Sequence, residues 1–339
     1  MKGPPPYLVR RLIWAPALVV GTFLLLTTLP LWIIVAAFAS RFVPGRWRPL
    51  RVAWFLFVYL TLESIAIVLL FVVWIVSGFG WKLRTPAFQT LHYKFAGIWL
   101  GLVMTAARRT FSLKITNADD PTPSSDAPLL VFSRHAGPGD SFLLIDAVLN
   151  QANRQPRIIL KDLLQVDPCV DILLNRVPSS FVPSYGQAGQ AVVDSIVDLA
   201  AGMDRSGALV LFPEGGNFTP ARRARAIEKL DEIGRPKLAD QAREMQYLLP
   251  PKPTGALAAI EAAPTADVVF IGHAGLEQLS TMRDLWRGIP MDADVVVRLW
   301  PVPAADIPPE SERERWLYDH WSAMDDWIGN QLNRQSAEP

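Results

Sequence analysis

The sequence predicts an α/β domain with a mainly parallel central sheet flanked by helices, preceded by an N-terminal two-helix membrane hairpin. Three observations predict this fold class. Two long apolar runs occupy residues 13–39 and 52–76, and short β-branched segments alternate with helical patterns after residue 128. Residues 1–114 contain 13 Lys and Arg against one acidic residue, whereas residues 115–339 contain 20 against 31. Such asymmetry indicates a basic segment apposed to a membrane, followed by an acidic globular body.

The hairpin is expected over residues 1–84. Each apolar run exceeds the ~20 residues that a helix needs to cross the hydrocarbon core of a bilayer. The linker between the runs is short and basic, so the two helices form a hairpin, and Pro30 is expected to kink the first helix. A shallow hairpin within one leaflet, with the linker arginines at the headgroups, is the alternative. Glu63, the acidic residue of the second run, is expected to pair with Thr27 and Thr28.

The globular part is expected over residues 85–339. An amphipathic helix over residues 88–110 leads into it, and another over residues 311–332 ends it, because apolar residues recur there at helical spacing. Between them, five segments predict strands: "LLVFSRH", "RIILKD", "GALVLFPEGG", "DVVFIGH" and "DVVVRLW". Strands that alternate with helices indicate a mainly parallel sheet. Together with the hairpin this predicts an integral membrane protein, with the globular part on the cytoplasmic face.

Composition argues against two classes of function. The globular part is acidic and lacks a basic stripe, so nucleic acid is not an expected partner. The single cysteine, Cys169, allows no intramolecular disulfide and no zinc cluster, and no metal site is expected. The best candidates for chemistry are then the polar residues that follow the predicted strands, because α/β domains place reactive groups where strands end and loops begin.

The first such stretch is "SRHAGPGD", residues 133–140. His135 follows a predicted strand, and the glycines and proline after it allow the loop to fold back so that Asp140 approaches the imidazole. A carboxylate beside an imidazole fixes its tautomer and stabilises the imidazolium that forms on proton uptake. Such a pair suits a general base that acts on a substrate hydroxyl. His273, in "FIGHAGLE", also ends a predicted strand and competes for this role.

The second stretch is "VLFPEGGNFTP", in which a predicted strand is again followed by a glycine-rich turn. Glu214 lies at the strand exit. Gly215 and Gly216 allow a ligand to approach the backbone closely and offer N–H groups to a phosphate or carbonyl oxygen. Of the arginines that follow, Arg222 is a natural phosphate partner.

These two stretches resemble a known family. "HAGPGD" followed about 80 residues later by "FPEGGNFTP" is similar to the first and third sequence blocks of the glycerolipid acyltransferases of the lysophosphatidate acyltransferase type. "LLPPKPTGALAAI" and the segment from "VVVRLWPV" to "WLYDHW" resemble the long-chain lysophospholipid acyltransferase branch. The resemblance covers roughly residues 85–330, and an N-terminal hairpin is also usual in that family.

The resemblance implies a glycerolipid acyltransferase-like fold and transfer of a fatty acyl group from acyl-CoA, or from acyl-carrier protein, to a hydroxyl of a lysophospholipid or related lipid acceptor. The hydroxyl attacks the thioester directly, with no acyl-enzyme, metal or cofactor. His135 would be the general base and Asp140 its partner. Glu214 and Gly215 would help to bind the acceptor.

The sequence departs from the family pattern at two places that bear on the acceptor phosphate. The third block usually reads Glu-Gly-Thr-Arg, and Gly216 and Asn217 replace the last two residues here. The second block usually ends in an arginine where this chain has Ser184. Either Arg176, Arg222 or Lys252 is expected to substitute for the missing arginines, or the acceptor is a lipid other than lysophosphatidate. Arg134, which directly precedes His135, is expected to contact an anion.

Two other functions use the same residues. The His135–Asp140 pair could activate water instead of a lipid hydroxyl, which would make the protein a thioesterase or esterase-type hydrolase. Loss of the usual arginines also fits a non-catalytic lipid-binding membrane protein, although this would leave the His–Asp pair and the Glu-Gly turn unexplained.

Overall fold

A computed structural model describes residues 3–118, 126–137, 139–183, 189–277, 282–292 and 294–337. It divides into two compact units. The first unit comprises Met1–Leu113, Ile145–Ala191 and Ile289–Asp292, and the second comprises Lys114–Leu144, Val192–Gly288 and Ala293–Pro339. The functional boundary expected after residue 84 stays a prediction.

The first unit begins with helices that form most of its apolar surface. They are α1 (Tyr7–Val9), a π-helical segment (Arg10–Trp14), α2 (Ala15–Thr27), α3 (Leu29–Ala39), α4 (Arg48–Val76) and α5 (Pro86–Phe111). The first apolar run is thus two helices, because Thr28 leaves helical geometry (φ −101°, ψ 8°) and Pro30 stands in the first turn of α3. Two helical stretches, Tyr7–Thr27 and Arg48–Val76, are long and apolar enough to cross a membrane.

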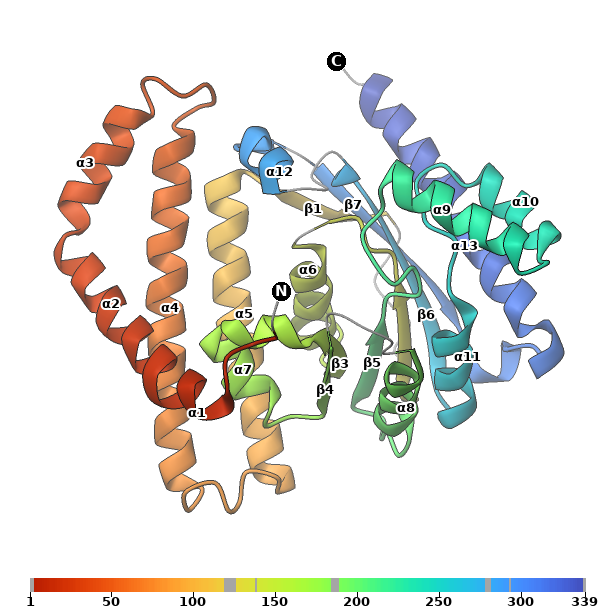
Figure 1. Ribbon diagram of the computed structural model, residues 1–339, viewed down its shortest axis with the longest axis horizontal. Helices are drawn as coiled ribbons and strands as arrows, with labels where there is room; N and C mark the ends of the chain where they lie inside the picture. Colours follow the sequence, from red (N-terminus) through yellow and green to blue (C-terminus); the bar gives the residue numbers. More distant parts are fainter. Residues whose placement is uncertain are drawn as a thin grey trace. The chain divides into compact units, whose positions relative to one another are not determined.

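Helix α4 buries one face and exposes the other. It contacts α2, α3, α5 and α7 (Pro168–Leu174), and Figure 1 shows it in orange beside α5. The buried residues recur at helical spacing and are Phe57, Glu63, Ala66, Ile67 and Leu70. The exposed apolar residues of α4 are Trp54, Leu56, Ile65, Val68, Leu69, Phe71, Val72, Ile75 and Val76. An exposed apolar face of this extent is typical of a membrane or protein contact.

The expected pairing of Glu63 with Thr27 and Thr28 is wrong. The Oε1 atom of Glu63 accepts a hydrogen bond from the backbone N–H of Cys169 at 2.7 Å, at the start of α7. The hydroxyls of Thr27 and Thr28 donate instead to the Leu24 carbonyl of their own helix, at 2.8 and 3.1 Å. Threonine in a helix commonly makes this bond to the preceding turn.

The rest of the first unit is the α/β part to which these helices attach. Strand β3 (Gln155–Lys161) pairs in parallel with β4 (Ser179–Val182). A π-helical segment (Ala147–Gln151) precedes β3, and a 3-10 helix (Asp162–Val166) follows it. Asp171 of α7 is buried and forms ion pairs with Arg10 and Arg11, both at 3.1 Å. The N-terminal segment is therefore fixed to α7.

The second unit is built on five strands. They are β1 (Lys114–Asn117), β2 (Leu129–Ser133), β5 (Gly207–Leu211), β6 (Asp267–Ala274) and β7 (Asp294–Val302), in the order β1-β7-β6-β2-β5. The pairs β1/β7, β2/β6 and β2/β5 are parallel, and β6/β7 is antiparallel. Every residue of β2 and β5 is buried, as expected of parallel strands covered on both faces. The predicted mainly parallel sheet is confirmed.

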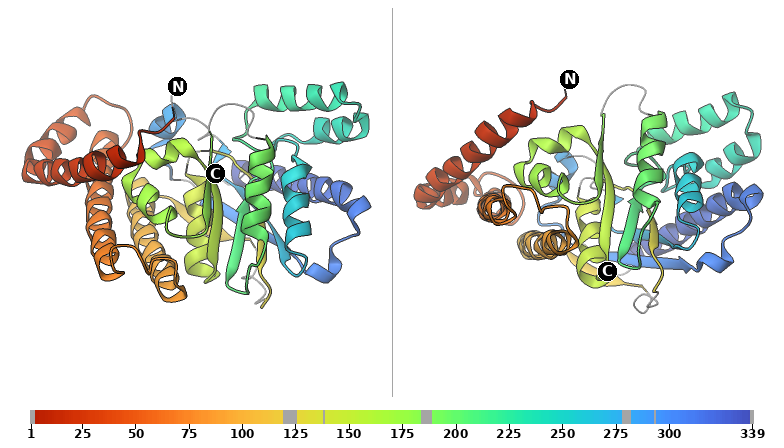
Figure 2. Two further views of the ribbon diagram at one scale, coloured as in Figure 1. Left: turned by 60° about the horizontal axis from the view of Figure 1, so that its bottom comes forward. Right: turned by 90° about the horizontal axis from the view of Figure 1, so that it is seen from below.

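Helices cover this sheet. They are α6 (Asp140–Asp146), α8 (Gly189–Ala200), α9 (Pro220–Glu232), α10 (Pro236–Glu244), α11 (Pro253–Ala262), α12 (Met282–Gly288) and α13 (Glu310–Ala337), and a 3-10 turn (Ala304–Asp306) precedes α13. Figure 2 shows α11 and α13 side by side, and they contact β2 and β6 respectively, so both cover one face of the sheet. Leu317, Trp321, Met324 and Ile328 of α13 are fully buried there.

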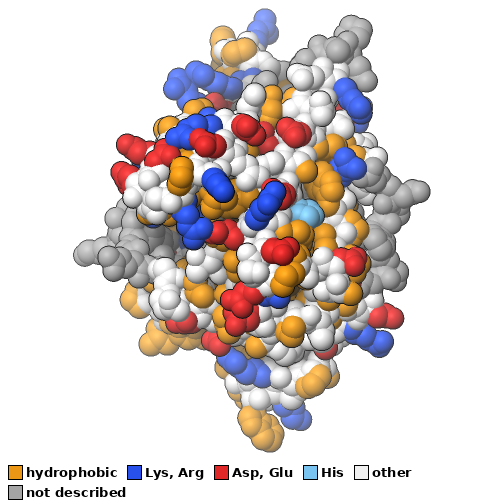
Figure 3. All heavy atoms as spheres, turned by 90° about the vertical axis from the view of Figure 1, so that its right-hand side faces the viewer, with side chains coloured by type: hydrophobic (Ala, Val, Ile, Leu, Met, Phe, Trp, Pro, Cys, Tyr) orange, Lys and Arg blue, Asp and Glu red, His pale blue; other side chains and the backbone are white. Residues whose placement is uncertain are grey.

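Figure 3 shows the outer surface on the side of α9, α10 and α13, where basic and acidic side chains alternate. Some of them form ion pairs, such as Arg235 with Glu314 and Arg243 with Asp231. These pairs are exposed and contribute little to stability, so this face is an ordinary solvated surface.

The parallel register places three strand exits at one edge of the sheet. Phe132 of β2 is level with Leu211 of β5, and Ser133 is level with Ile271 of β6. The residues that follow these strands therefore meet. In open α/β sheets ligands bind at this carboxyl edge.

Candidate active site

The structure brings His135 and Asp140 together at the end of β2. The Nδ1 atom of His135 lies 3.0 Å from both carboxylate oxygens of Asp140. An Nδ1–H that donates to the carboxylate leaves Nε2 unprotonated and able to accept a proton. The His135 side chain is 23% exposed, which allows a substrate to reach it. Its ring also packs against Phe212, with ring centroids 4.6 Å apart.

Asp140 is fixed by the loop that it closes. Its Oδ2 atom accepts hydrogen bonds from the backbone N–H groups of Ala136 and Gly137, at 2.7 and 3.2 Å. Gly139 has a φ of +109°, which only glycine adopts without strain, and lets the chain turn back at this point. Burial is the largest single effect and opposes ionisation of Asp140, but the hydrogen bond from His135, the charges of His135 and His273 and the N–H of Gly137 together outweigh it, so the pKa of Asp140 is lowered. The carboxylate is therefore ionised at neutral pH.

The loop after β5 meets the loop after β2. The backbone N–H of His135 donates to Oε1 of Glu214 at 2.9 Å, and the N–H of Phe218 donates to the carbonyl of His135 at 3.1 Å. The Oε2 atom of Glu214 accepts from the N–H of Leu249 at 3.1 Å. Glu214 thus joins three segments that are distant in the sequence.

Glu214 does not line an open groove, which corrects the expectation that it helps to bind the acceptor. It is only 2% exposed, and both of its oxygens are bonded to backbone. Burial raises its pKa to about 7, although Arg134 and the two backbone hydrogen bonds oppose this. Glu214 positions the His135 loop.

Arg134 also departs from the expected substrate contact. It is 1% exposed, and its guanidinium donates to the His273 carbonyl at 2.5 Å and to Oε1 of Glu277 at 2.6 Å. A third bond reaches the Tyr247 carbonyl at 3.3 Å. Both terminal nitrogens of the buried guanidinium thus bond to internal partners, so Arg134 fixes the backbone next to His135.

Gly215 and Gly216 form the turn with two of the expected cations beside it. A Cβ atom on Gly215 would lie 2.6 Å from Nζ of Lys252, and one on Gly216 would lie 3.1 Å from a guanidinium nitrogen of Arg222. The backbone N–H of Lys252 donates to the Pro213 carbonyl at 2.8 Å, which fixes it next to the turn. Partial desolvation, together with nearby cations that include Arg222, lowers the pKa of Lys252. The turn therefore carries two cations and two glycines, a combination suited to an anion.

One further cation is expected at the phosphate, Arg176. Arg176 belongs to the first unit, where it donates to the Leu70 carbonyl at 2.9 Å and approaches Nε2 of His92 at 3.4 Å. Burial lowers its pKa to about 10. Its part in phosphate binding stays a prediction. Ser184 lies outside the described residues.

Asp325 of α13 is a site residue that sequence reasoning missed. Its carboxylate accepts hydrogen bonds from three consecutive backbone N–H groups, those of Gln246, Tyr247 and Leu248, at 2.7 to 2.8 Å. The next N–H, from Leu249, donates to Glu214. A chain of hydrogen bonds thus runs from α13 to the backbone of His135. The sequence carries no signal for it, because Asp325 appears there as one acid of an amphipathic helix.

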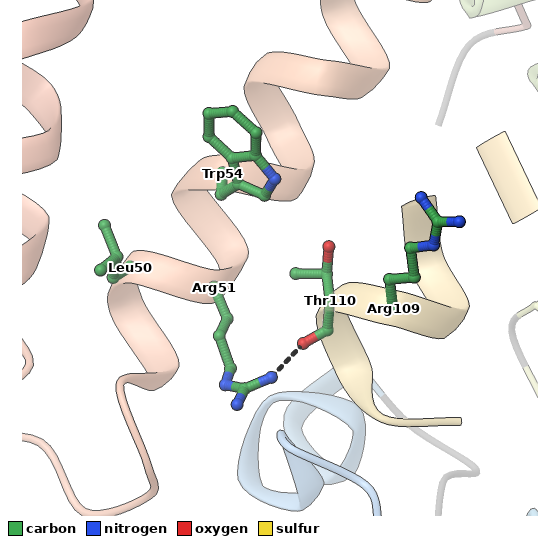
Figure 4. A pocket seen from close by; sticks show the side chains of 5 residues that line it. All are labelled: Leu50, Arg51, Trp54, Arg109 and Thr110. Atoms are coloured by element: carbon green, nitrogen blue, oxygen red, sulfur yellow. Dashed lines mark hydrogen bonds between the residues drawn. The ribbon is translucent and has the colours of Figure 1, made fainter. Parts of the chain in front are cut away.

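The described residues contain no cluster of three or more His, Cys, Asp or Glu side chains able to hold a metal ion. A shallow pocket of about 290 Å³ lies in the first unit and is lined by Leu50, Arg51, Trp54, Arg109 and Thr110. Figure 4 shows Arg51 reaching from α4 to the Thr110 carbonyl while Arg109 points away from it. The Arg51–Thr110 hydrogen bond joins the start of α4 to the end of α5, and none of these residues belongs to the His135 site.

No protein-family model matches the chain, and no curated protein matches it. Among solved structures, the chain is similar to the crystal structure of the 1-acyl-sn-glycerophosphate (LPA) acyltransferase PlsC from Thermotoga maritima. The TM-score is 0.46 and the sequence identity is 12%, over 80% of this chain and 96% of that one. We base the function below on the geometry of the site.

Proposed function

We propose that the protein is a membrane-bound O-acyltransferase that transfers a fatty acyl group from a thioester donor, acyl-CoA or acyl-carrier protein, to a hydroxyl of a lysophospholipid or related glycerolipid. The observation that carries the proposal is the partly exposed His135 imidazole, whose Nδ1 is bonded to the buried Asp140 carboxylate. A base of this kind, held in one tautomer, is what direct attack by a hydroxyl requires.

The reaction then follows from the groups at the carboxyl edge of the sheet. Nε2 of His135 takes the proton of the acceptor hydroxyl as its oxygen attacks the thioester carbonyl, and Asp140 stabilises the imidazolium. The carbon–sulfur bond breaks, the new ester forms, and the proton passes to the leaving thiolate. His135 thereby returns to its neutral state, ready for another reaction.

An acceptor with a phosphate fits the turn beside the base. Lys252 and Arg222 flank Gly215 and Gly216, and the turn is joined to His135 through Glu214 and Phe218. We propose that these two cations take the place of the arginines usual at the third block. Lys252→Gln should raise KM for a phosphate-bearing acceptor about tenfold, since one charge-assisted hydrogen bond is lost.

The membrane is the expected source of the acceptor. The exposed apolar residues of α2, α3 and α4 support a bilayer contact, and the two long apolar helices support it further. Because Glu63 and Asp171 attach α4 and the N-terminal segment to α7 of the α/β part, we favour a hairpin that rests in one leaflet over one that spans the bilayer.

The decisive experiment compares His135→Ala and His135→Asn in purified protein. Asparagine can keep the hydrogen bond to Asp140 but has no counterpart of Nε2. We expect both variants to lose at least ~10³-fold in acyl transfer, at the level typical of a lost general base, while they remain folded. The products formed from a panel of lysolipids and acyl thioesters should be identified by mass spectrometry.

The same assay distinguishes the alternatives, because each gives a different result. Free fatty acid released at the same rate with and without a lipid acceptor would identify a hydrolase. Binding of lipid without any turnover would identify a non-catalytic lipid-binding protein. Full activity of His135→Asn would show that His135 is not the general base.

A further inference from the structure

His273 is a buried histidine that the proposed reaction does not use. It lies near the end of β6 and is 7% exposed. Neither of its ring nitrogens has a hydrogen-bond partner among the residues that the structure describes. Buried polar side-chain atoms are almost always partnered in folded proteins, so an imidazole with two free nitrogens calls for an explanation.

The nearest group that could satisfy this ring is the carboxylate of the dyad. Nε2 of His273 lies 3.8 Å from Oδ2 of Asp140, whose two oxygens lie 3.0 Å from Nδ1 of His135. Asp140 therefore has an imidazole on two sides. The other charged groups that act on His273 are Arg134 and Glu277.

The backbone beside His273 is held by hydrogen bonds to buried groups. Arg134 bonds both the His273 carbonyl and Glu277, and Glu277 accepts from the N–H of Gly275 at 2.8 Å. Gly275 has a φ of +108°, and a Cβ atom there would lie 2.5 Å from the Asp294 carbonyl oxygen. Only glycine fits at this point. The backbone of residues 273–277 is thereby held in one conformation.

We propose that His273 is a positioning residue of the dyad, and that its Nε2–H donates a hydrogen bond to Oδ2 of Asp140. The proposal rests on the proposed function of His135 as the base. A closing movement of about 1 Å brings the two atoms from their present distance to an ordinary hydrogen bond. Asp140 then receives N–H donors from two imidazoles as well as from the backbone.

The consequence is a weaker stabilisation of the His135 imidazolium by Asp140. A donor that bonds the charged form of a carboxylate lowers its basicity. Asp140 then still orients His135, but it stabilises the protonated imidazole less. This suits a base that must afterwards release the proton to the leaving group. Burial and the neighbouring Arg134 lower the pKa of His273 to about 4, so it donates as a neutral ring.

The first test reads the tautomer of His273 in the wild-type protein, and variants serve only to assign the signals. In ¹⁵N-histidine-labelled protein in detergent, the ring nitrogens of the four histidines report tautomer and titration, and His135→Asn and His273→Gln assign the two site residues. We expect His273 to be the Nε2–H tautomer at pH 7. A His273 ring with a bare Nε2 overturns the proposal, whatever the protein catalyses.

The second test compares His273→Phe with His273→Gln. Phenylalanine fills the space without a donor, whereas the amide nitrogen of glutamine can replace Nε2–H. We expect the titration midpoint of His135 to rise by about 0.5 unit or more in His273→Phe, because Asp140 becomes more basic. His273→Gln should stay close to the wild type. Equal midpoints in His273→Phe and wild type, or equal shifts in both variants, reject the proposal.

The activity assay separates this proposal from the proposed function. If acyl transfer is observed, the acid limb of the kcat/KM profile should move to higher pH in His273→Phe and return in His273→Gln, a shift that a merely structural residue does not produce. If wild-type protein transfers no acyl group, the proposed function fails, and the NMR titration still decides whether His273 bonds Asp140.

Discussion

Gly215 is the residue at which a left-handed backbone conformation coincides with the proposed anion site. Its φ is +69°, and a Cβ atom there would lie 2.6 Å from Nζ of Lys252. Gly215→Ala should therefore cost about 1 kcal/mol in backbone strain and push the ammonium group away from the turn. We expect KM for a phosphate-bearing acceptor to rise severalfold with little change in kcat, measured by steady-state kinetics.

A matched control separates strain from displacement of Lys252. Gly202 has a similar φ of +63°, but a Cβ atom there meets nothing within 4 Å. Gly202→Ala should lower stability by a similar amount and leave KM unchanged. Equal KM values in the two variants would show that Lys252 does not contact the acceptor.

The sequence predicts which residues pair at the candidate site better than it predicts which charged residues are buried. His135 and Asp140 could be paired in advance, because the small residues between them allow the loop to fold back. The burial of Arg134 and Glu214 could not be predicted, because a charged residue next to an apolar strand gives the same sequence pattern whether it faces a ligand or the protein interior. In the structure both are buried by partners that come from distant segments, around Tyr247 and Leu249.

At the scale of elements, α13 supports the site through Asp325. Its carboxylate fixes the backbone of residues 246–248, and that segment reaches His135 through Glu214. Asp325→Asn replaces one acceptor oxygen by a donor that faces backbone N–H groups. We expect the free energy of unfolding to fall by about 1–3 kcal/mol and activity to fall with it, measured by denaturant titration and by the acyltransfer assay.

The neighbouring Asp326 is the matched control for Asp325, because it is exposed on the same helix. Asp326→Asn should change stability by less than ~0.5 kcal/mol, as usual for a surface site. Similar losses in both variants would mean that helix α13 is sensitive to any charge change and that the contact with residues 246–248 is unimportant.

Elements with strong periodicity could be predicted, and those formed by tertiary contacts could not. Apolar spacing predicts α4, α5 and α13 within a few residues of their observed bounds. Strand β1 is short and half-exposed, and α10 has few apolar residues, so neither has a pattern that stands out. The partner of the buried Glu63 could not be predicted for the same reason, because Cys169 is 106 residues away in the sequence.

The exposed apolar face of α4 should bind a bilayer. Val68, Phe71 and Val72 are 46–57% exposed, and burying a large apolar side chain is worth about 1.5–3 kcal/mol. The triple change of these residues to serine should lower binding to phospholipid vesicles at least ~10-fold. Flotation of vesicles with bound protein measures this.

A second triple variant tests whether the effect belongs to the hairpin. Leu164, Val197 and Ile233 are 38–59% exposed but lie outside α2, α3 and α4. Their change to serine should leave vesicle binding unchanged. An equal loss in both triple variants would mean that general surface hydrophobicity drives the binding.

For the whole molecule, two buried groups of the second unit make stability depend on pH in opposite directions. His273 has a folded-state pKa of about 4 against an ordinary 6.5, so below pH 6.5 the unfolded chain binds a proton that the folded chain does not. Stability therefore falls as pH drops from about 6.5 to about 4. Glu214 has a folded-state pKa of about 7 against an ordinary 4.5, so its contribution is lost as pH rises through that range.

The two effects overlap and partly cancel between about pH 4.5 and 6.5, and single variants should reveal each of them. His273→Phe leaves the Glu214 effect, so its stability, compared with wild type, should decline as pH rises through this window. Glu214→Gln leaves the His273 effect, so its stability relative to wild type should increase with pH. One mismatched hydrogen bond also lowers its stability by an amount that does not depend on pH. Each change should be roughly 1–3 kcal/mol across the window, since one pKa unit corresponds to about 1.4 kcal/mol. Tryptophan fluorescence during denaturant unfolding at several pH values measures both slopes, and slopes of the same sign in the two variants would contradict the opposed burial of these groups.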